Sequence, residues 1–371
     1  MTQNNVEWAR IGDFISICDE TNSSNYDLNV IGINRDKEFM PTVANLESID
    51  LRKYKVVRKN RFVFSGMQTG RDICIRISLY EQDIPALISP AYTTFEIKDF
   101  SKLLPEYLLI YFLRKEMDRY GWFISDSSVR ANLDWSRFLD IKIPIPAIDI
   151  QKKVVNTWKH IREVKEQNEA IAEPLFQLCQ SYIQELWKTI PHKEIGNYIT
   201  RIDRRNTDNT VKVVKSVSVK KEFNDTNAKV DKNNLASYKI VEDGQISFVQ
   251  TTGNEKCLCA AVNHFGYPIV VTSVNEVFET NSEYLLADYL HIVFRRSETD
   301  RYARFNSWGS ARETFTWDDM KRFSVPIPPI SKQQAIVDLY KCANEAKRIA
   351  EEADKLSREI CPALIQKVVH E

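Results

Sequence analysis

The stretch Ile143-Pro144-Ile145-Pro146, followed by Gln151-Lys152-Lys153-Val154-Val155, decides how this chain of 371 residues is organised. The same pattern returns 182 positions later (143 to 325) as Val325-Pro326-Ile327-Pro328, followed by Gln333-Gln334-Ala335-Ile336-Val337. Proline fixes φ and biases the preceding residue towards extended backbone, so each proline-rich segment predicts a rigid, non-helical junction. We expect a long helix to begin after each junction.

The segments upstream of the two junctions are also related. Leu103-Leu104-Pro105-Glu106-Tyr107-Leu108 returns as Leu285-Leu286-Ala287-Asp288-Tyr289-Leu290, and Asp118-Arg119-Tyr120 returns as Asp300-Arg301-Tyr302, again 182 positions later (118 to 300). Nearer the N-terminus the offset is 184 positions (11 to 195 and 54 to 238). So small a drift indicates a duplication with short insertions. The repeat is too long for a solenoid, and each copy is large enough to hold its own core.

Composition excludes several classes of protein. The chain has 51 basic and 51 acidic residues, so its formal net charge is zero, which argues against binding nucleic acid by electrostatics alone. Its seven cysteines are scattered without CxxC spacing, so we expect neither a disulfide framework nor a zinc site. No apolar stretch is long enough to cross a membrane, and the polar N-terminus does not resemble a signal peptide. A cytoplasmic protein is expected.

Each copy begins with a mixed, β-leaning part. In the first copy, alternating apolar and polar residues predict strands at 56–57, 61–64, 73–77 and 93–97. One helix is predicted at 103–117, with Pro105 in its first turn. The resulting division of the chain has four parts, which are mixed domains at 1–147 and 191–330 and helical segments at 148–190 and 331–371.

Both helical segments carry residues at alternating steps of three and four, which predicts a heptad-like seam on each helix. The bulky seam of the first helix includes Ile161, Ile171, Leu175 and Leu178. The small seam of the second includes Ala343, Ala346, Ala350 and Ala353. We expect the two helices to pack together as a spacer of about 60 Å, the length of roughly 40 helical residues. The alternative is that each amphipathic helix lies on its own domain.

Motifs of catalysis are absent from the sequence. It contains no GxxxxGK[ST], GxSxG or HExxH motif, and no Gly-x-Gly follows a predicted strand. The five histidines show no metal-binding spacing. We therefore predict no catalytic residue and no metal site.

Polar, basic loops occur at equivalent places in the two copies, at 66–71 and 249–256 and again at 127–130 and 309–312. Arginine reads guanine edges, glutamine and asparagine read adenine edges, and serine and threonine bind phosphates or bases. The loops differ between the copies while the surrounding scaffold persists, which is expected of two readers of different sequences; the alternative is ordinary solvated loops. The predicted DNA-binding residues are Gln68, Thr69, Arg71, Ser128, Arg130, Gln250, Thr252, Asn254, Lys256, Ser310 and Arg312.

The order of mixed domain, proline-rich strand and Gln-led helix, present twice, resembles the specificity (S) subunit of type I restriction-modification systems. The resemblance covers essentially the whole chain. It implies an α+β fold in which two mixed α/β target recognition domains form a tandem pseudo-repeat, separated by two long helices packed as an antiparallel coiled coil. Each target recognition domain would read one half of a bipartite site in double-stranded DNA.

The same resemblance implies partners and cofactors. Modification subunits would methylate adenine with S-adenosylmethionine, and restriction subunits would translocate and cleave DNA. The S subunit itself would be non-catalytic and bind no cofactor, because S-adenosylmethionine, ATP and Mg²⁺ belong to the partner subunits. The setting would be a bacterial or archaeal cytoplasm. Two alternatives stay open, the specificity subunit of a type IIB-like system and, in a different class, a coiled-coil scaffold that binds protein.

Overall fold

The computed structural model describes residues 6–47, 49–67, 72–126, 131–226, 229–251, 257–309 and 313–370. It divides into two compact units, the first made of Met1–Gln167 with Ile349–Glu371 and the second of Asn168–Arg348. The boundaries between the units fall inside the two longest helices, α5 (Ile148–Thr189) and α9 (Ile330–Glu359). The four-part division of the sequence, with boundaries at 147, 190 and 330, stays a prediction.

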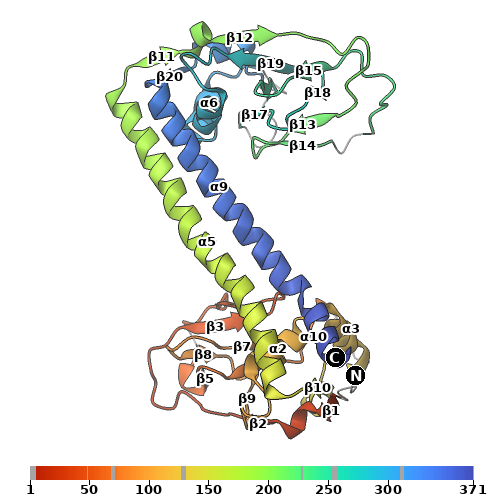
Figure 1. Cartoon of the computed structure of the whole chain (residues 1–371). Coiled ribbons are helices and arrows are strands. Elements are labelled where there is room, and N and C mark those ends of the chain that lie inside the picture. Colours follow the sequence, from red (N-terminus) through yellow and green to blue (C-terminus); the bar gives the residue numbers. More distant parts are fainter. Residues whose placement is uncertain are drawn as a thin grey trace. The chain divides into compact units, whose positions relative to one another are not determined.

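The first unit contains two four-stranded sheets, with strand orders β2-β9-β6-β7 and β4-β3-β8-β5, and the two-stranded ladder β1-β10 (Figure 1). Its strands are β1 (Glu7–Arg10), β2 (Ile15–Ile17), β3 (Val30–Ile33), β4 (Phe39–Pro41), β5 (Lys55–Val57), β6 (Phe62–Ser65), β7 (Arg76–Leu79), β8 (Ala86–Ile88), β9 (Thr93–Ile97) and β10 (Lys142–Ile145). Short 3-10 helices lie at Ile11–Asp13 and Leu51–Lys53.

The second unit repeats the first of these sheets as β12-β19-β16-β17 and the ladder as β11-β20, and it adds the pairs β13-β14 and β15-β18. Its strands are β11 (His192–Glu194), β12 (Ile199–Ile202), β13 (Lys215–Val217), β14 (Phe223–Asp225), β15 (Lys239–Val241), β16 (Ile246–Val249), β17 (Ala260–Val262), β18 (Ile269–Val271), β19 (Asn275–Thr280) and β20 (Ser324–Pro326). A 3-10 helix spans Ile195–Tyr198. The equal strand order confirms the predicted α+β class and shows that the sequence repeat is a repeat of fold.

The proline-rich segments are extended, as predicted. Strand β10 pairs antiparallel with β1, with Pro144 opposite Trp8, and β20 pairs antiparallel with β11, with Pro326 opposite His192. Proline cannot donate a backbone hydrogen bond, and each of these strands has only one neighbour, so the proline removes no bond from a sheet interior.

The shorter helices of the first unit are α2 (Pro105–Phe112), α3 (Lys115–Ile124), α4 (Trp135–Leu139) and α10 (Cys361–His370). Those of the second unit are α6 (Ala287–Phe294), α7 (Ser297–Phe305) and α8 (Trp317–Arg322). The single helix predicted at 103–117 is wrong, because Arg114 has extended backbone (φ −71°, ψ 136°) and separates α2 from α3. The strand predicted at 73–77 begins only at Arg76, whereas β5, β6 and β9 confirm the other three predicted strands.

Each unit has its own apolar core. The first is completed by α10, which is distant in the sequence, and the second by the end of α5, which directly precedes β11. The first core includes Cys361, Ile365 and Val368 of α10, which packs against α2. The second core includes Ile183 and Leu186 from the end of α5. Positions 183 and 365 are related by the same 182-residue offset, so α10 contributes to the first unit what the end of α5 contributes to the second.

Parts of α5 and α9 run antiparallel within each unit. In the first unit, Trp158 Nε1 donates to the Ser357 carbonyl at 3.0 Å and Lys165 Nζ lies 2.7 Å from Asp354 Oδ1. In the second unit, the Phe176 and Tyr340 rings meet at 5.5 Å. The predicted pairing of the two helices is therefore present in both units.

The predicted seams agree only in part with the buried faces. Ala343, Ala346, Ala350 and Ala353 are all buried along α9. On α5, Ile161 and Leu175 are partly buried. Ile171 and Leu178, however, are each 51% exposed, and Ala172 and Cys179 are buried in their place. The contact side of α5 thus lies one residue, about 100° of helical rotation, from the predicted position at these two turns.

A buried glutamine fixes the start of each long helix. In the first unit, Gln151 Oε1 accepts from the Leu104 amide at 2.9 Å, and its Nε2 donates to the carbonyls of Lys102 and Pro146 at 2.8 and 2.9 Å. In the second unit, Gln333 makes the equivalent bonds to the Leu286 amide at 2.9 Å and to the carbonyls of Tyr284 and Pro328 at 2.7 and 2.8 Å. Both side chains are fully buried. One amide group thereby joins the long helix to the proline that precedes it and to the N-terminus of α2 or α6.

We expect Gln151→Ala to lower the free energy of unfolding of the first unit by roughly 2–5 kcal/mol, because three buried or partly buried hydrogen bonds to the backbone would be lost. Urea unfolding and hydrogen exchange in peptides around 100–106 measure the effect. Gln334→Ala is the matched control, since Gln334 is exposed and bonds only to Asp338 among the described residues. Equal stability of the Gln151 and Gln334 variants would contradict the role of this joint.

One titratable side chain distinguishes the two cores. His291 on α6 bonds to the Lys221 carbonyl through Nε2 at 2.8 Å, and burial lowers its pKa from 6.5 to about 4. The equivalent position in the first unit is Leu109. A histidine that stays neutral in the folded state stabilises it fully above the unfolded pKa, and this stability is lost as the pH falls from 6.5 towards 4.

We therefore expect the second unit to lose about 2 kcal/mol of stability between pH 7 and pH 5 through His291 alone. His291→Leu, which copies the first unit, should lower stability at pH 7 yet remove this pH dependence. The measurement is urea unfolding of both forms at the two pH values, with the exposed His160→Ala as the control. An unchanged pH dependence in the Leu variant would show that another group titrates.

Among the described residues, the structure contains no helix that is long and apolar enough to cross a membrane.

Candidate nucleic-acid interface

The predicted DNA-binding residues fall largely outside the described part of the chain. Those outside it are Gln68, Thr69, Arg71, Ser128, Arg130, Thr252, Asn254, Lys256, Ser310 and Arg312. Gln250 is described, and so are the residues that flank each loop. The structural argument therefore rests on the described residues that flank each loop, which we call the loop roots.

Gln250 is bonded within its own unit. Its Nε2 donates to the carboxylate of Glu276, a buried side chain of β19. The same carboxylate receives two bonds from Arg201, at 2.6 and 2.8 Å, and one from Lys239 at 3.3 Å. The Gln250 amide would have to leave this cluster in order to read a base edge.

The two candidate loops of the first unit are joined at their roots. The Gly66 carbonyl accepts from the Leu133 amide at 2.9 Å, which ties the start of one loop to the end of the other. A Cβ atom at position 66 would lie 1.8 Å from the Leu133 carbonyl oxygen, so only glycine permits this approach. The second loop is itself closed, because Asp126 N donates to the Asn132 carbonyl and Asn132 N donates to Asp126 Oδ1, both at 2.9 Å.

The second unit has the same arrangement. The Gln250 carbonyl accepts from the Phe315 amide at 2.8 Å, and Trp308 and Thr314 exchange backbone hydrogen bonds at 2.9 and 3.1 Å. Trp308 and Thr314 lie 182 positions after Asp126 and Asn132. The structure thus brings together, in each unit, the roots of the two loops that the sequence predicts as DNA readers.

A buried lysine supports the residues that follow the loop at 66–71. Lys37 lies in the turn between β3 and β4 with a positive φ of 64°, and its ammonium group binds the carbonyl of Phe112 at the end of α2. Its Nζ also lies 2.7 Å from Asp118 Oδ1 on α3, and that oxygen accepts from the Ile75 amide at 2.9 Å. The Lys37 side chain is only 3% exposed, so its charge depends on Asp118 for compensation.

We call this arrangement, a buried lysine bound to a helix-end carbonyl and an aspartate, a lysine bracket. The second unit has an equivalent one. Lys221 has a φ of 62°, binds the carbonyl of Phe294 and lies 2.7 Å from Asp300 Oδ1, which accepts from the Leu258 amide at 3.0 Å. The sequence analysis missed both lysines. The repeated Asp118-Arg119-Tyr120 and Asp300-Arg301-Tyr302 triplets were the available signal, because each begins with the aspartate of a bracket.

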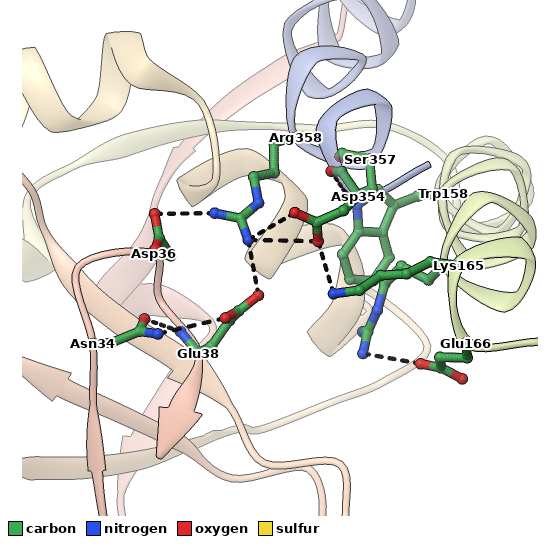
Figure 2. Close-up of polar contacts among 10 residues, drawn as sticks. Asn34, Asp36, Glu38, Trp158, Lys165, Glu166, Asp354, Ser357 and Arg358 are labelled. Atoms are coloured by element: carbon green, nitrogen blue, oxygen red, sulfur yellow. Dashed lines mark hydrogen bonds and ion pairs between the residues drawn. The ribbon is translucent and has the colours of Figure 1, made fainter. Parts of the chain in front are cut away.

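The turn that holds Lys37 also contacts the end of α9 (Figure 2). Arg358 reaches Asp36 and Glu38 at 3.0 Å each and Asp354 at 3.2 Å, and Asp354 in turn pairs with Lys165 of α5. Residues on either side of Lys37 therefore bind α9, while Lys37 itself binds α2 and α3. These exposed pairs contribute less stability than the buried lysine bracket.

The described residues of this region do not meet the requirements of a metal site. Across the described ranges, no three His, Cys, Asp or Glu side chains are placed to hold a metal ion. Cys257 and Cys259 have sulfur atoms 3.8 Å apart, but burial raises the pKa of Cys259 to about 12, which keeps this thiol protonated.

We expect Asp118→Ala to destabilise the first unit by roughly 3–5 kcal/mol, because it leaves the buried Lys37 ammonium without a counter-charge. It should also raise hydrogen exchange at the Ile75 amide. Asp118→Asn retains an acceptor for that amide and separates the two effects. Asp83→Ala, at an exposed carboxylate paired with Lys59, is the control and should change stability by less than about 0.5 kcal/mol. A similar small change in the Asp118→Ala variant would contradict the bracket.

Comparison with known proteins gives a family and a fold. Residues 5–174 match the family model of the type I restriction modification DNA specificity domain. The fold is similar to the crystal structure of the type I restriction-modification system S subunit from M. genitalium, with a TM-score of 0.63 and 13% identity over 99% of this chain and 97% of that one. The HsdS subunit from Thermoanaerobacter tengcongensis aligns over 99% of this chain and 97% of that one at 13% identity, with a TM-score of 0.42. No curated protein sequence matches the chain.

Proposed function

Residues 5–174 belong to the type I restriction modification DNA specificity domain family, and from this premise we propose that the chain is the DNA-recognition subunit of a type I restriction-modification complex. It reads a bipartite site in double-stranded DNA, one half with each unit. The observation that carries the proposal is the repeated root geometry, in which each unit joins the same two loops and supports one of them on a buried lysine.

The second unit supports this reading although the family match ends at residue 174. It has the same sheet order, the same buried glutamine and the same lysine bracket as the first unit. Its loop residues nevertheless differ from those of the first. An equal scaffold with different loops is what two readers of different half-sites require.

The proposed partners are double-stranded DNA, modification subunits that methylate adenine, and restriction subunits that translocate and cleave. The chain positions these subunits and does no chemistry of its own. S-adenosylmethionine, ATP and Mg²⁺ are expected on the partners, and the complex is expected to act in the cytoplasm. The balanced charge of the chain fits this division of labour, because partner subunits would supply much of the contact with phosphates.

We expect Arg130→Ala to relax recognition in one half of the site and Arg312→Ala to relax it in the other half. A lost base contact typically costs about 1–3 kcal/mol and affects only the position that it reads. The measurement is sequencing of the methylated motif in cells that express the chain with its modification subunits. Arg52→Ala, at an exposed arginine on a different element, is the control.

Two outcomes would contradict this proposal. Motifs unchanged in both variants would show that these loops do not read DNA. If cells that express the wild-type chain with its modification subunits show no methylated motif, a protein-binding scaffold would be favoured over a DNA reader.

A further inference from the structure

The exposed face of α7 combines arginine with aromatic side chains. Arg301, Arg304 and Phe305 are spaced three and four positions apart, so they share one face of the helix, and all three are exposed. Phe305 is 85% exposed, and Trp308, which lies one turn further on, is also exposed. The face therefore presents a large apolar surface beside two arginines, of which Arg301 lies 3.8 Å from Glu298.

The equivalent helix of the first unit has the same kind of face. Arg119, Trp122 and Phe123 of α3 lie 182 positions before Arg301, Arg304 and Phe305. Phe123 is 80% exposed, and its ring lies 6.4 Å from that of Tyr120. Single exposed apolar residues are common on proteins, but a phenylalanine exposed at the same place in two diverged copies calls for a shared cause.

Packing within the unit does not supply that cause. Tyr302, on the same helix, turns inward and contacts Phe323 at 4.9 Å and Phe315 at 6.3 Å. Phe305 and Phe123 point away from these cores. Their positions also lie next to the loop roots, because α7 ends three residues before Trp308 and α3 ends two residues before Asp126.

The charges on these faces favour DNA as the occupant. The acidic residues of the two helices, Glu116 and Asp118 in α3 and Glu298 and Asp300 in α7, are all in the first turns, where they complement the helix dipole. Asp118 and Asp300 are already paired with the buried lysines. The ends nearest the loop roots carry arginine and aromatic side chains. Arginine binds phosphate oxygens, and aromatic side chains contact or wedge against bases. A partner protein with an acidic, apolar surface is the competing occupant, and the experiment below separates the two.

We propose that the arginine–aromatic faces of α3 and α7 contact the duplex beside each reading loop. Arg119 and Arg301 bind phosphates, and Phe123 and Phe305 contact sugars or base edges in the adjoining groove. The inference rests on the proposed function, because it places this surface on the same DNA as the loops. It adds a contact that lies on a rigid helix and that the sequence analysis did not identify.

The test uses the complex of the full chain with its modification subunits and a duplex that carries its mapped methylation motif. Phe305→Ala should weaken binding roughly five- to hundredfold, the range typical of a lost aromatic–base contact, at an unchanged salt dependence. Arg301→Ala should weaken binding to all sequences and lower the slope of log K against log salt by about 1. Phe123→Ala and Arg119→Ala should act in the same way through the first unit.

Matched controls are Ile84→Ala, at another strongly exposed apolar side chain, and Arg52→Ala. Arg301→Lys should restore the salt slope, because lysine retains the charge. If the complex methylates its motif and binds it with equal affinity and salt slope in all four variants, this inference is overturned while the proposed function stands. If the variants instead lose the modification subunits on co-purification, the face binds protein, which also overturns it. A wild-type complex without sequence-specific binding would overturn the proposed function itself.

Discussion

The buried side-chain amide at the start of each long helix is the constraint on which both units depend. Gln151 and Gln333 each accept one hydrogen bond and donate two, which join the start of α2 or α6 to the proline-rich segment. Among side chains of this length only glutamine offers an acceptor and two donors, since the carboxylate of glutamate could only accept. The joint is reinforced by Tyr107 and Tyr289, whose hydroxyl groups donate to the carbonyls of Pro144 and Pro326 at 3.1 and 2.8 Å. The direction of each long helix is therefore set by the sheet-bearing part that precedes it.

The repeat, the proline-rich strands and the long helices could be predicted from the sequence because each depends on local pattern. The lysine brackets were not predicted, because Lys37 meets Phe112 and Asp118 only after the chain has folded. A sequence signal was present, since Lys37-Glu38-Phe39 returns as Lys221-Glu222-Phe223 at the 184-residue offset. Of the predicted seam of α5, Leu175 is partly buried whereas Ile171 is exposed. Spacing alone cannot distinguish a bulky residue from its small neighbour Ala172 when the partner helix approaches closely. The candidate DNA-binding residues were predicted as loops, and their individual contacts stay predictions.

The two units preserve the support of their loops while they differ in the residues that form the roots. The first unit uses Gly66, which allows direct contact with the Leu133 backbone, whereas the second places Gln250 there and holds its side chain on Glu276. His291 of the second unit similarly occupies the position of Leu109 in the first, and it binds the Lys221 carbonyl. Substitutions at Gly66 or Gln250 change one unit without touching the glutamine joint, whereas His291 contacts the bracket lysine Lys221 of its own unit only. Each reading surface can therefore vary independently of the other.

The composition of the first unit has a consequence for the order of synthesis. Its core needs Cys361, Ile365 and Val368, whereas the second unit is formed by the continuous segment Asn168–Arg348. A ribosome makes the residues of α10 after every other part of both cores. The second unit can thus complete its core on the nascent chain while the first, although begun earlier, still exposes apolar surface of α2. Premature termination near residue 349 would leave the second unit with all its residues and the first, although translated earlier, without its closing helix.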